Sequence, residues 1–168
     1  GTCVAGVVAP GQWVPRPEGQ PGGKHGFDGA GRFEKLGIDN VLLPQGERIE
    51  FARRRDLAAG GKAFAEGTQA KAAKLGWAIS DTAIAQVNAH FAMLAKQAAN
   101  ETRLAPRAVL VVDELGRLEL LRGCGLTNAL AILDAGPTPQ FPHAIAVVRE
   151  TLLDEARRRF EPRWGKAT

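Results

Sequence analysis

The segment from Ala108 to Leu120 reads AVLVVDELGRLEL. Its first five residues are all apolar, Pro106 lies just before them, and Asp113 and Glu114 follow them directly. A short apolar run between a proline and charged residues is typical of a strand that is buried on both faces of a sheet. We therefore expect a central strand over residues 108–112, with two carboxylates at its carboxyl end.

These two carboxylates have two interpretations. Open parallel sheets bind ligands at the carboxyl ends of their strands. In a phosphoryl-transfer site, the first acid would hold Mg²⁺ and the second would orient or deprotonate the attacking water. The alternative is an ordinary buried strand that ends in a solvated acidic turn. The pair of acids alone does not distinguish the two.

The second half of the chain alternates between apolar runs and helical patterns. Residues His143–Val148 are expected to form a second fully apolar strand that ends at Arg149, and leucines at helical spacing predict a helix over residues 126–133. A last helix is predicted from Thr151 to Phe160, because Pro162 would end it. Strands that alternate with helices in this way indicate a parallel sheet with crossover helices.

The first half is expected to contain short strands and a long loop. Val4–Ala9 is predicted to be a buried strand, and the many prolines and glycines of residues 10–31 predict a loop. Residues 41–43 and 48–51 are β-prone pieces on either side of the polar tip 44–47, which predicts a β-hairpin. The first half therefore contributes a strand and a hairpin to the predicted α/β fold.

A long helix is predicted between the two halves. Leu75–Ile79 is a short predicted strand, after which Ser80 or Asp81 can cap a helix. Apolar residues then recur at helical spacing along one face through about Ala98. These residues are Ile84, Val87, Phe91 and Leu94. Residues 54–74 have no clear period and are expected to be irregular or weakly helical.

Composition indicates one globular domain. The chain has 168 residues, of which 45% are hydrophobic, enough for a sizeable core. Its formal net charge of +4 is only mildly basic, so we expect no nucleic-acid partner. The two cysteines lie far apart in the sequence, and reduced thiols in a cytoplasmic protein are the simpler interpretation. No apolar stretch approaches the roughly 20 residues of a membrane-spanning helix, so we expect no membrane partner.

Three glycine–lysine pairs invite comparison with a phosphate-binding loop. They are Gly23-Lys24, Gly61-Lys62 and Gly165-Lys166. Such a loop requires the pattern G-x-x-x-x-G-K-[ST], in which the last hydroxyl holds Mg²⁺. None of the three pairs is followed by serine or threonine, so the sequence contains no intact motif of this type.

Several segments taken together resemble one protein family. In chain order they are Val4–Pro10, Gly26–Asp28, Gly46–Arg48, Asp113–Leu120, Val147–Arg149 and Arg159–Phe160. The combination resembles the small bacterial and archaeal nucleoside-triphosphatases of the P-loop class, first typified by thermophilic enzymes, and the block DELGRLEL is its most specific part. The resemblance covers nearly the whole chain. It implies a three-layer α/β fold with a mostly parallel sheet and crossover helices, together with the hairpin of the first half.

The resemblance also implies an activity and a set of site residues. The activity is Mg²⁺-dependent hydrolysis of a nucleoside triphosphate to the diphosphate and phosphate. Asp113 matches the metal-coordinating acid, and Glu114 matches the water-activating acid. Gly116 and Glu119 lie in the same block and are expected to contact the bound cofactor. Arg149, at the end of the next strand, is expected to neutralise phosphate charge.

The sequence departs from the family pattern at its beginning. Members of the family start with a strand, a phosphate-binding loop and its helix before the segment that resembles Val4–Pro10. We therefore expect residues 1–168 to be a single domain that is incomplete at its N-terminus, and inactive by itself. The missing strand should leave residues 108–112 with an unpaired edge, which a second copy or a partner chain would cover.

Two functional hypotheses remain open from the sequence. The first is a nucleoside triphosphate hydrolase whose acids work on a phosphate-binding loop supplied from elsewhere. The second is a non-catalytic nucleotide-binding, regulatory or interaction module that keeps the fold and has lost the loop. Both share one ancestry, so the resemblance does not separate them.

Overall fold

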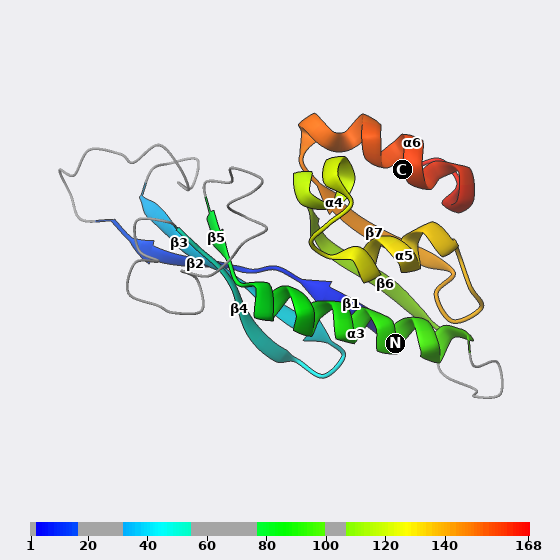
Figure 1. Cartoon of the computed structure of the whole chain (residues 1–168), viewed down its shortest axis with the longest axis horizontal. Helices are drawn as coiled ribbons and strands as arrows, with labels where there is room; N and C mark the ends of the chain where they lie inside the picture. The colour runs from blue at the N-terminus through cyan, green and yellow to red at the C-terminus, as the bar shows by residue number, and fades with distance from the viewer. Residues whose placement is uncertain (1–2, 17–31, 55–76, 100–106) are drawn as a thin grey trace.

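The computed structural model describes residues 3–16, 32–54, 77–99 and 107–168, which form an α/β fold with one mixed sheet (Figure 1). The sheet has seven strands in this part; six run in the order β5-β4-β3-β1-β6-β7, and β2 pairs with β3 beside this path. The strands are β1 (Cys3–Val8), β2 (Gly11–Pro15), β3 (Phe33–Leu43), β4 (Glu47–Arg54), β5 (Trp77–Ile79), β6 (Ala108–Leu115) and β7 (His143–Val148). The helices are α3 (Asp81–Ala99), α4 (Arg117–Arg122), α5 (Thr127–Ala135) and α6 (Leu153–Trp164), with a short 3₁₀-helix at Glu150–Leu152. The predictions for residues 17–31 and 55–74 lie outside the described residues.

Strand β6 lies in the middle of the parallel half of the sheet. It pairs with β1 on one side, where Val4 is opposite Val109, and with β7 on the other, where Ile145 is opposite Val111. The predicted strand at 108–112 is confirmed, but the predicted unpaired edge of this strand is wrong. A crossover through helix α5 returns the chain beside β6, so β7 is the outer strand of the described sheet on this side.

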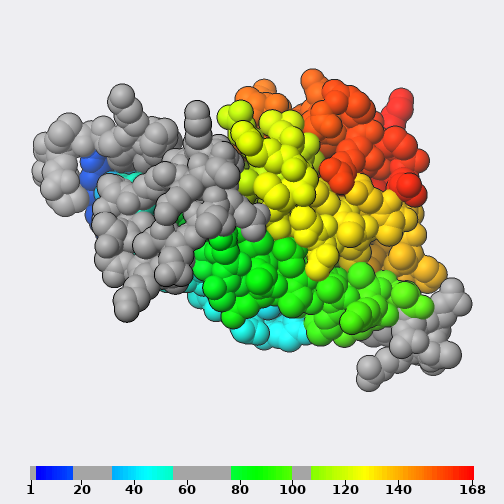
Figure 2. All heavy atoms as spheres, in the orientation of Figure 1, coloured from blue at the N-terminus to red at the C-terminus, as the bar shows by residue number. Residues whose placement is uncertain are grey.

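Helices α3, α5 and α6 form one layer against the sheet. Helix α3 contacts α5, and α5 contacts α6; Figures 1 and 2 show the three helices next to one another on one side of the molecule. The side chains of Val7, Leu110 and Val112 are fully buried in the core that this layer covers. Trp164 Nε1 donates a hydrogen bond to the Leu133 carbonyl oxygen at 2.7 Å, which joins α6 to α5.

The opposite face of the parallel strands carries exposed apolar side chains. Val4, Ile145 and Val147 are 39%, 54% and 42% exposed. The expected three-layer arrangement is therefore not found in the part that the structure describes, where α3, α5 and α6 cover one face. Strand β7 is apolar as predicted, but its side chains are mostly exposed, because alternate residues point to the face without a packed helix.

The first half of the chain makes the sheet mixed rather than mostly parallel. Strands β3 and β4 form the predicted hairpin, and both strands extend beyond the predicted pieces. Residues 11–15, predicted to lie in a loop, form strand β2 and pair with β3 in antiparallel fashion. Pro15 is the last residue of β2, where a missing backbone N–H is tolerated. Because β1 also pairs with β3 in antiparallel fashion, only β1, β6 and β7 are parallel neighbours.

The helices agree with the sequence except at two places. Ser80 Oγ accepts a hydrogen bond from the Ala83 N–H at 3.2 Å and so caps α3, as predicted. Helix α4 was not predicted, and α6 continues through Pro162 to Trp164 instead of ending before the proline. The Trp164 side chain bonds to α5 and holds this last turn in place. None of the helices in the described ranges has the length and apolar character needed to cross a membrane.

Candidate functional site

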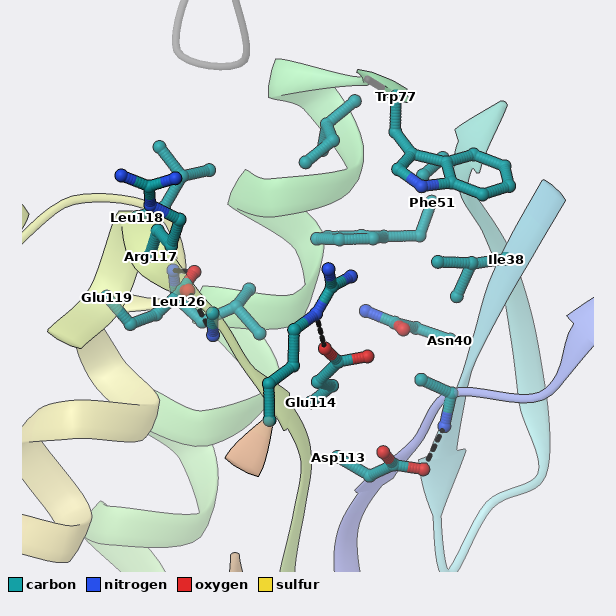
Figure 3. Close-up of a pocket in the computed structure, with 15 residues that line it drawn as sticks. Ile38, Asn40, Phe51, Trp77, Asp113, Glu114, Arg117, Leu118, Glu119 and Leu126 are labelled. Carbon is teal, nitrogen blue, oxygen red and sulfur yellow. Dashed lines mark hydrogen bonds and ion pairs between the residues drawn. The ribbon is translucent and has the colours of Figure 1, made fainter. Parts of the chain in front are cut away.

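A cavity of about 240 Å³ lies at the carboxyl end of β6. Asp113 and Glu114, at the end of β6, and Arg149, just after β7, all line it. Gly116 and Glu119 from the start of α4 line it as well. The structure therefore brings together all five residues that the sequence singled out. Figure 3 shows Asp113 and Glu114 between the sheet side and the α4 side of this pocket.

Asp113 joins the ends of two parallel strands. Its Oδ2 accepts a hydrogen bond from the Ala9 N–H, just after β1, at 2.9 Å. The other carboxylate oxygen has no hydrogen-bond partner among the described residues. Asp113 is thus held by one oxygen, and its second oxygen is available to a ligand in the cavity.

Glu114 and Arg149 form an ion pair at the cavity. The Arg149 Nε donates to Glu114 Oε1 at 2.8 Å, and the arginine side chain is largely exposed. An exposed pair of this kind contributes only about 0–1 kcal/mol, because water screens it and two side chains lose freedom. A phosphate group can therefore compete for the guanidinium at little cost in stability.

Glu119 organises the chain between β6 and α5. Its side chain is buried; Oε2 accepts a hydrogen bond from the Gly116 N–H and Oε1 accepts one from the Leu126 N–H, both at 2.9 Å. The first bond runs from the backbone N–H of Gly116, the N-cap residue of helix α4, to the side chain of Glu119 in the first turn of that helix. Both carboxylate oxygens are thus engaged within the chain, and a contact between Glu119 or Gly116 and a cofactor stays a prediction.

The burial of Glu119 predicts a pH-dependent stability. Burial raises the pKa of Glu119 above its ordinary value of 4.5, while hydrogen bonds from Leu126 and Gly116 act in the opposite direction. Because the pKa is higher in the folded chain, folding favours the protonated form of Glu119. This preference stabilises the folded chain below pH 4.5, and the stabilisation is lost as the pH rises through the raised pKa. We expect the melting temperature of the chain to fall relative to that of Glu119→Gln between about pH 4 and about pH 8.

The measurement is a series of thermal unfolding curves of both proteins over this pH range. Glu47→Gln, which removes an exposed carboxylate at the start of β4, serves as the control. Its melting temperature should differ from that of the unmutated chain by the same amount at every pH. The prediction would be contradicted if the melting temperature of the unmutated chain rose relative to that of Glu119→Gln as the pH increased.

The sheet side of the cavity is formed by residues that the sequence did not single out. They are Ile38 and Asn40 of β3, Phe51 of β4 and Trp77 of β5. Asn40 is only 1% exposed, and its Nδ2 has no hydrogen-bond partner in the part of the chain described. Figure 3 shows its amide pointing into the pocket. One signal could have found it, because Asp39 and Asn40 are polar residues within the otherwise apolar stretch 36–43 of this strand.

The neighbouring residues Asp39 and Asn40 differ in whether their polar side-chain atoms have hydrogen-bond partners. The buried Asp39 carboxylate accepts hydrogen bonds from Gln12 Nε2 at 2.5 Å and from Arg48 Nη1 at 2.6 Å. Hydrogen bonds from other strands of the sheet therefore account for the burial of the Asp39 carboxylate. The Asn40 Nδ2 has no such contact, although it lies beside the cavity.

The carboxylates at the cavity suit a hard cation such as Mg²⁺. Mg²⁺ is usually bound through one or two carboxylates together with water and substrate phosphates, not by a cage made only of protein. Asp113 and Glu114 offer such oxygen ligands. Within the described ranges there is no group of three or more His, Cys, Asp or Glu residues that could hold a metal alone. The donor set thus fits Mg²⁺ that arrives with a phosphate ligand.

Comparison with protein-family models, with curated proteins and with solved structures found no match. The resemblance to nucleoside-triphosphatases thus depends on the motif residues of the sequence.

Proposed function

We propose that this chain is a nucleoside-triphosphatase-like protein. Its cavity would bind the phosphate end of a Mg²⁺–nucleoside triphosphate and support hydrolysis to the diphosphate and phosphate when a phosphate-binding loop is supplied. The observation that carries the proposal is the convergence of Asp113, Glu114 and Arg149 on one cavity at the carboxyl ends of adjacent parallel strands. This is where open parallel sheets place their ligands.

Each of the three residues has a role that its contacts support. Asp113 would hold Mg²⁺ through the carboxylate oxygen that the Ala9 N–H leaves available. When bound, Mg²⁺ offsets negative charge on the phosphate oxygens. Glu114 would accept a proton from the water that attacks the γ-phosphorus, while the bond from that phosphorus to the bridging oxygen breaks and the diphosphate leaves.

Arg149 would hold Glu114 in place before the substrate binds and then turn to the phosphate. Its guanidinium can donate to phosphate oxygens as well as to a carboxylate, because arginine binds both groups through charge-assisted hydrogen bonds. This exchange would release Glu114 Oε1 from the ion pair seen at 2.8 Å. The carboxylate would then be available to the attacking water.

A non-catalytic nucleotide-binding module is the second candidate function. The observation that favours it is the same ion pair, because the Glu114 oxygen that accepts from Arg149 is then not available to the attacking water. In that case the cavity would bind a Mg²⁺–triphosphate and leave it intact. The two candidates share the binding step and differ in the release of phosphate.

We expect Mg²⁺-dependent binding of a non-hydrolysable triphosphate, measured by titration calorimetry with and without EDTA. Asp113→Asn should weaken this binding by roughly 10- to 100-fold, because it removes the metal-binding charge and keeps an acceptor for the Ala9 N–H. Asp154→Asn, the same change at an exposed position on α6, should bind like the unmutated chain. Equal binding by Asp113→Asn and the chain would reject the proposed metal role.

Glu114→Gln separates the two candidate functions in the same experiment. It should bind the triphosphate as the unmutated chain does, because the amide keeps the shape of the carboxylate. Any phosphate that the chain releases above background should fall by at least about 100-fold in this variant, since the proton acceptor is lost. Release that is unchanged by Glu114→Gln would exclude the hydrolase, and binding without release when a phosphate-binding loop is supplied would favour the module.

A further inference from the structure

The sheet side of the cavity contains a hydrogen-bond donor without a partner. Asn40 is 1% exposed, and its Nδ2 lacks any acceptor among the described residues. A buried donor that stays unsatisfied destabilises a protein, so nearly all such groups are paired with protein, water or ligand. Because the amide points into the pocket in Figure 3, the missing acceptor is one that enters from the cavity.

The surroundings of Asn40 are apolar and aromatic. Ile38, Phe51 and Trp77 are partly buried residues that pack against the core and also line the cavity. The Lys35 Nζ lies 5.9 Å from the centroid of the Trp77 ring, a cation–π contact that helps to fix the orientation of the indole. A flat apolar wall with one fixed polar donor is the arrangement that binds and orients a planar heterocycle.

The wall belongs to the same cavity as the acids but has different chemistry. Glu114 lies next to Asn40 in Figure 3, and its carboxylate is paired with the Arg149 guanidinium. An uncharged ring is suited to the wall itself, because Ile38, Phe51 and Trp77 offer no positive charge to a phosphate. At about 240 Å³ the cavity is smaller than the roughly 300–1,000 Å³ of pockets for drug-sized ligands, so it suits a small group such as one ring system.

We propose that Asn40, Phe51 and Trp77 form a subsite for a planar heterocycle that carries a ring nitrogen or carbonyl acceptor, namely the nucleobase of the nucleotide. The naming of this ring as a nucleobase depends on the function proposed above. Asn40 Nδ2 donates to the acceptor, and Phe51 and Trp77 contact the faces or edges of the ring. Every nucleobase presents such acceptors, and aromatic side chains stack on any base.

The test uses nucleosides, which have the base and no phosphate. Adenosine, guanosine, cytidine and uridine are titrated into the chain, with ribose as the control, and binding is followed by calorimetry and by quenching of tryptophan fluorescence. At least one nucleoside should bind and quench, ribose should do neither, and Trp77→Leu should lose both signals. Trp13 and Trp164, the other two tryptophans, do not line the cavity.

Asn40→Leu tells a ligand-binding role from a structural one. It should bind the nucleoside about tenfold more weakly, because one hydrogen bond is lost. Its melting temperature without ligand should be unchanged or higher, because the variant removes an unsatisfied donor and keeps the volume. The matched control is Asn88→Leu on α3, whose amide bonds to the Gly125 carbonyl and the Asn128 N–H at 2.9 Å. This control should melt at a lower temperature and bind nucleosides as before.

The outcomes separate this subsite from the proposed function. Nucleosides that fail to bind, or that bind Asn40→Leu as tightly as the unmutated chain, would overturn the subsite. So would a lower melting temperature of Asn40→Leu with unchanged nucleoside affinity. Mg²⁺ with inorganic tripolyphosphate probes the phosphate end alone. If it binds and the nucleosides do not, the subsite fails and the phosphate site stands; the reverse result supports the subsite and rejects the phosphate site.

Discussion

Phe91→Ala is expected to lower the free energy of unfolding by about 3–5 kcal/mol. Phe91 lies on the buried face of α3 and is completely inaccessible to solvent. Its ring packs in the cluster that joins this helix to the strands of the sheet. Truncation removes the transfer free energy of the ring and leaves a cavity that the surrounding rigid elements cannot fill. Because whole domains are stable by only about 5–15 kcal/mol, this loss is a large part of the total.

Urea unfolding followed by circular dichroism measures the effect. Met93→Ala is the matched control, because Met93 lies two residues further along the same helix and is 36% exposed. It should cost less than about 1 kcal/mol. If Phe91→Ala does not fold, Phe91→Leu keeps the measurement possible with a smaller loss. Equal losses for the Phe91 and Met93 variants would contradict the assignment of the buried face of α3.

Gly125→Ala is expected to cost about 2–4 kcal/mol, which combines backbone strain with the disturbance of a buried carboxylate. Gly125 has a φ of +75°, which side-chain-bearing residues rarely adopt. A Cβ atom there would lie 2.1 Å from Glu119 Oε1 and 3.1 Å from the Leu118 Cβ. The carboxylate would have to move, and its hydrogen bond from the Leu126 N–H would be lost.

Gly123→Ala separates the two contributions. Gly123 also has a positive φ, +62°, but a Cβ atom there would meet nothing within 4 Å. This variant should therefore show only the backbone cost, about 1–2 kcal/mol. Thermal and urea unfolding of both variants give the comparison. If Gly125→Ala is no less stable than Gly123→Ala, Glu119 can move at little cost and is not the rigid link between α4 and α5.

Gly125→Ala is also expected to change the shape of the cavity. Leu118, Glu119 and Leu126 line the α4 side of the cavity, and the hydrogen bonds of Glu119 set the position of this segment. A displaced carboxylate would change the wall opposite Asn40. We therefore regard Glu119 as a residue that shapes the site through the backbone, whether or not it also contacts a ligand.

Some features of this protein followed from local patterns in the sequence. The apolar run at 108–112 specified a central strand, and the helical spacing of Ile84, Val87, Phe91 and Leu94 specified the buried face of α3. The spacing and number of apolar residues determine such elements, because they decide which side chains are buried when the chain folds. The convergence of Asp113, Glu114 and Arg149 could be predicted for a related reason, since the carboxyl ends of parallel strands meet at one edge.

Other features were decided only by the tertiary structure. Strand β7 has the apolar composition of a buried strand, but Ile145 and Val147 point to the sheet face that none of the described helices covers, and they stay exposed. Residues 11–15 carry loop-forming residues, but pairing with β3 makes them a strand. Strand neighbours are contacts between distant residues, and local sequence does not state which edge a strand will join.

The same reason explains why Asn40 was missed and Glu119 was only partly understood. The sequence determined that two acids stand at the end of a central strand, and that no phosphate-binding loop of the usual pattern accompanies them. Only the folded chain placed the Asn40 amide beside those acids and turned Glu119 towards the Gly116 and Leu126 N–H groups. Whether a polar atom is satisfied depends on which backbone and side-chain groups surround it, and packing of distant segments decides this.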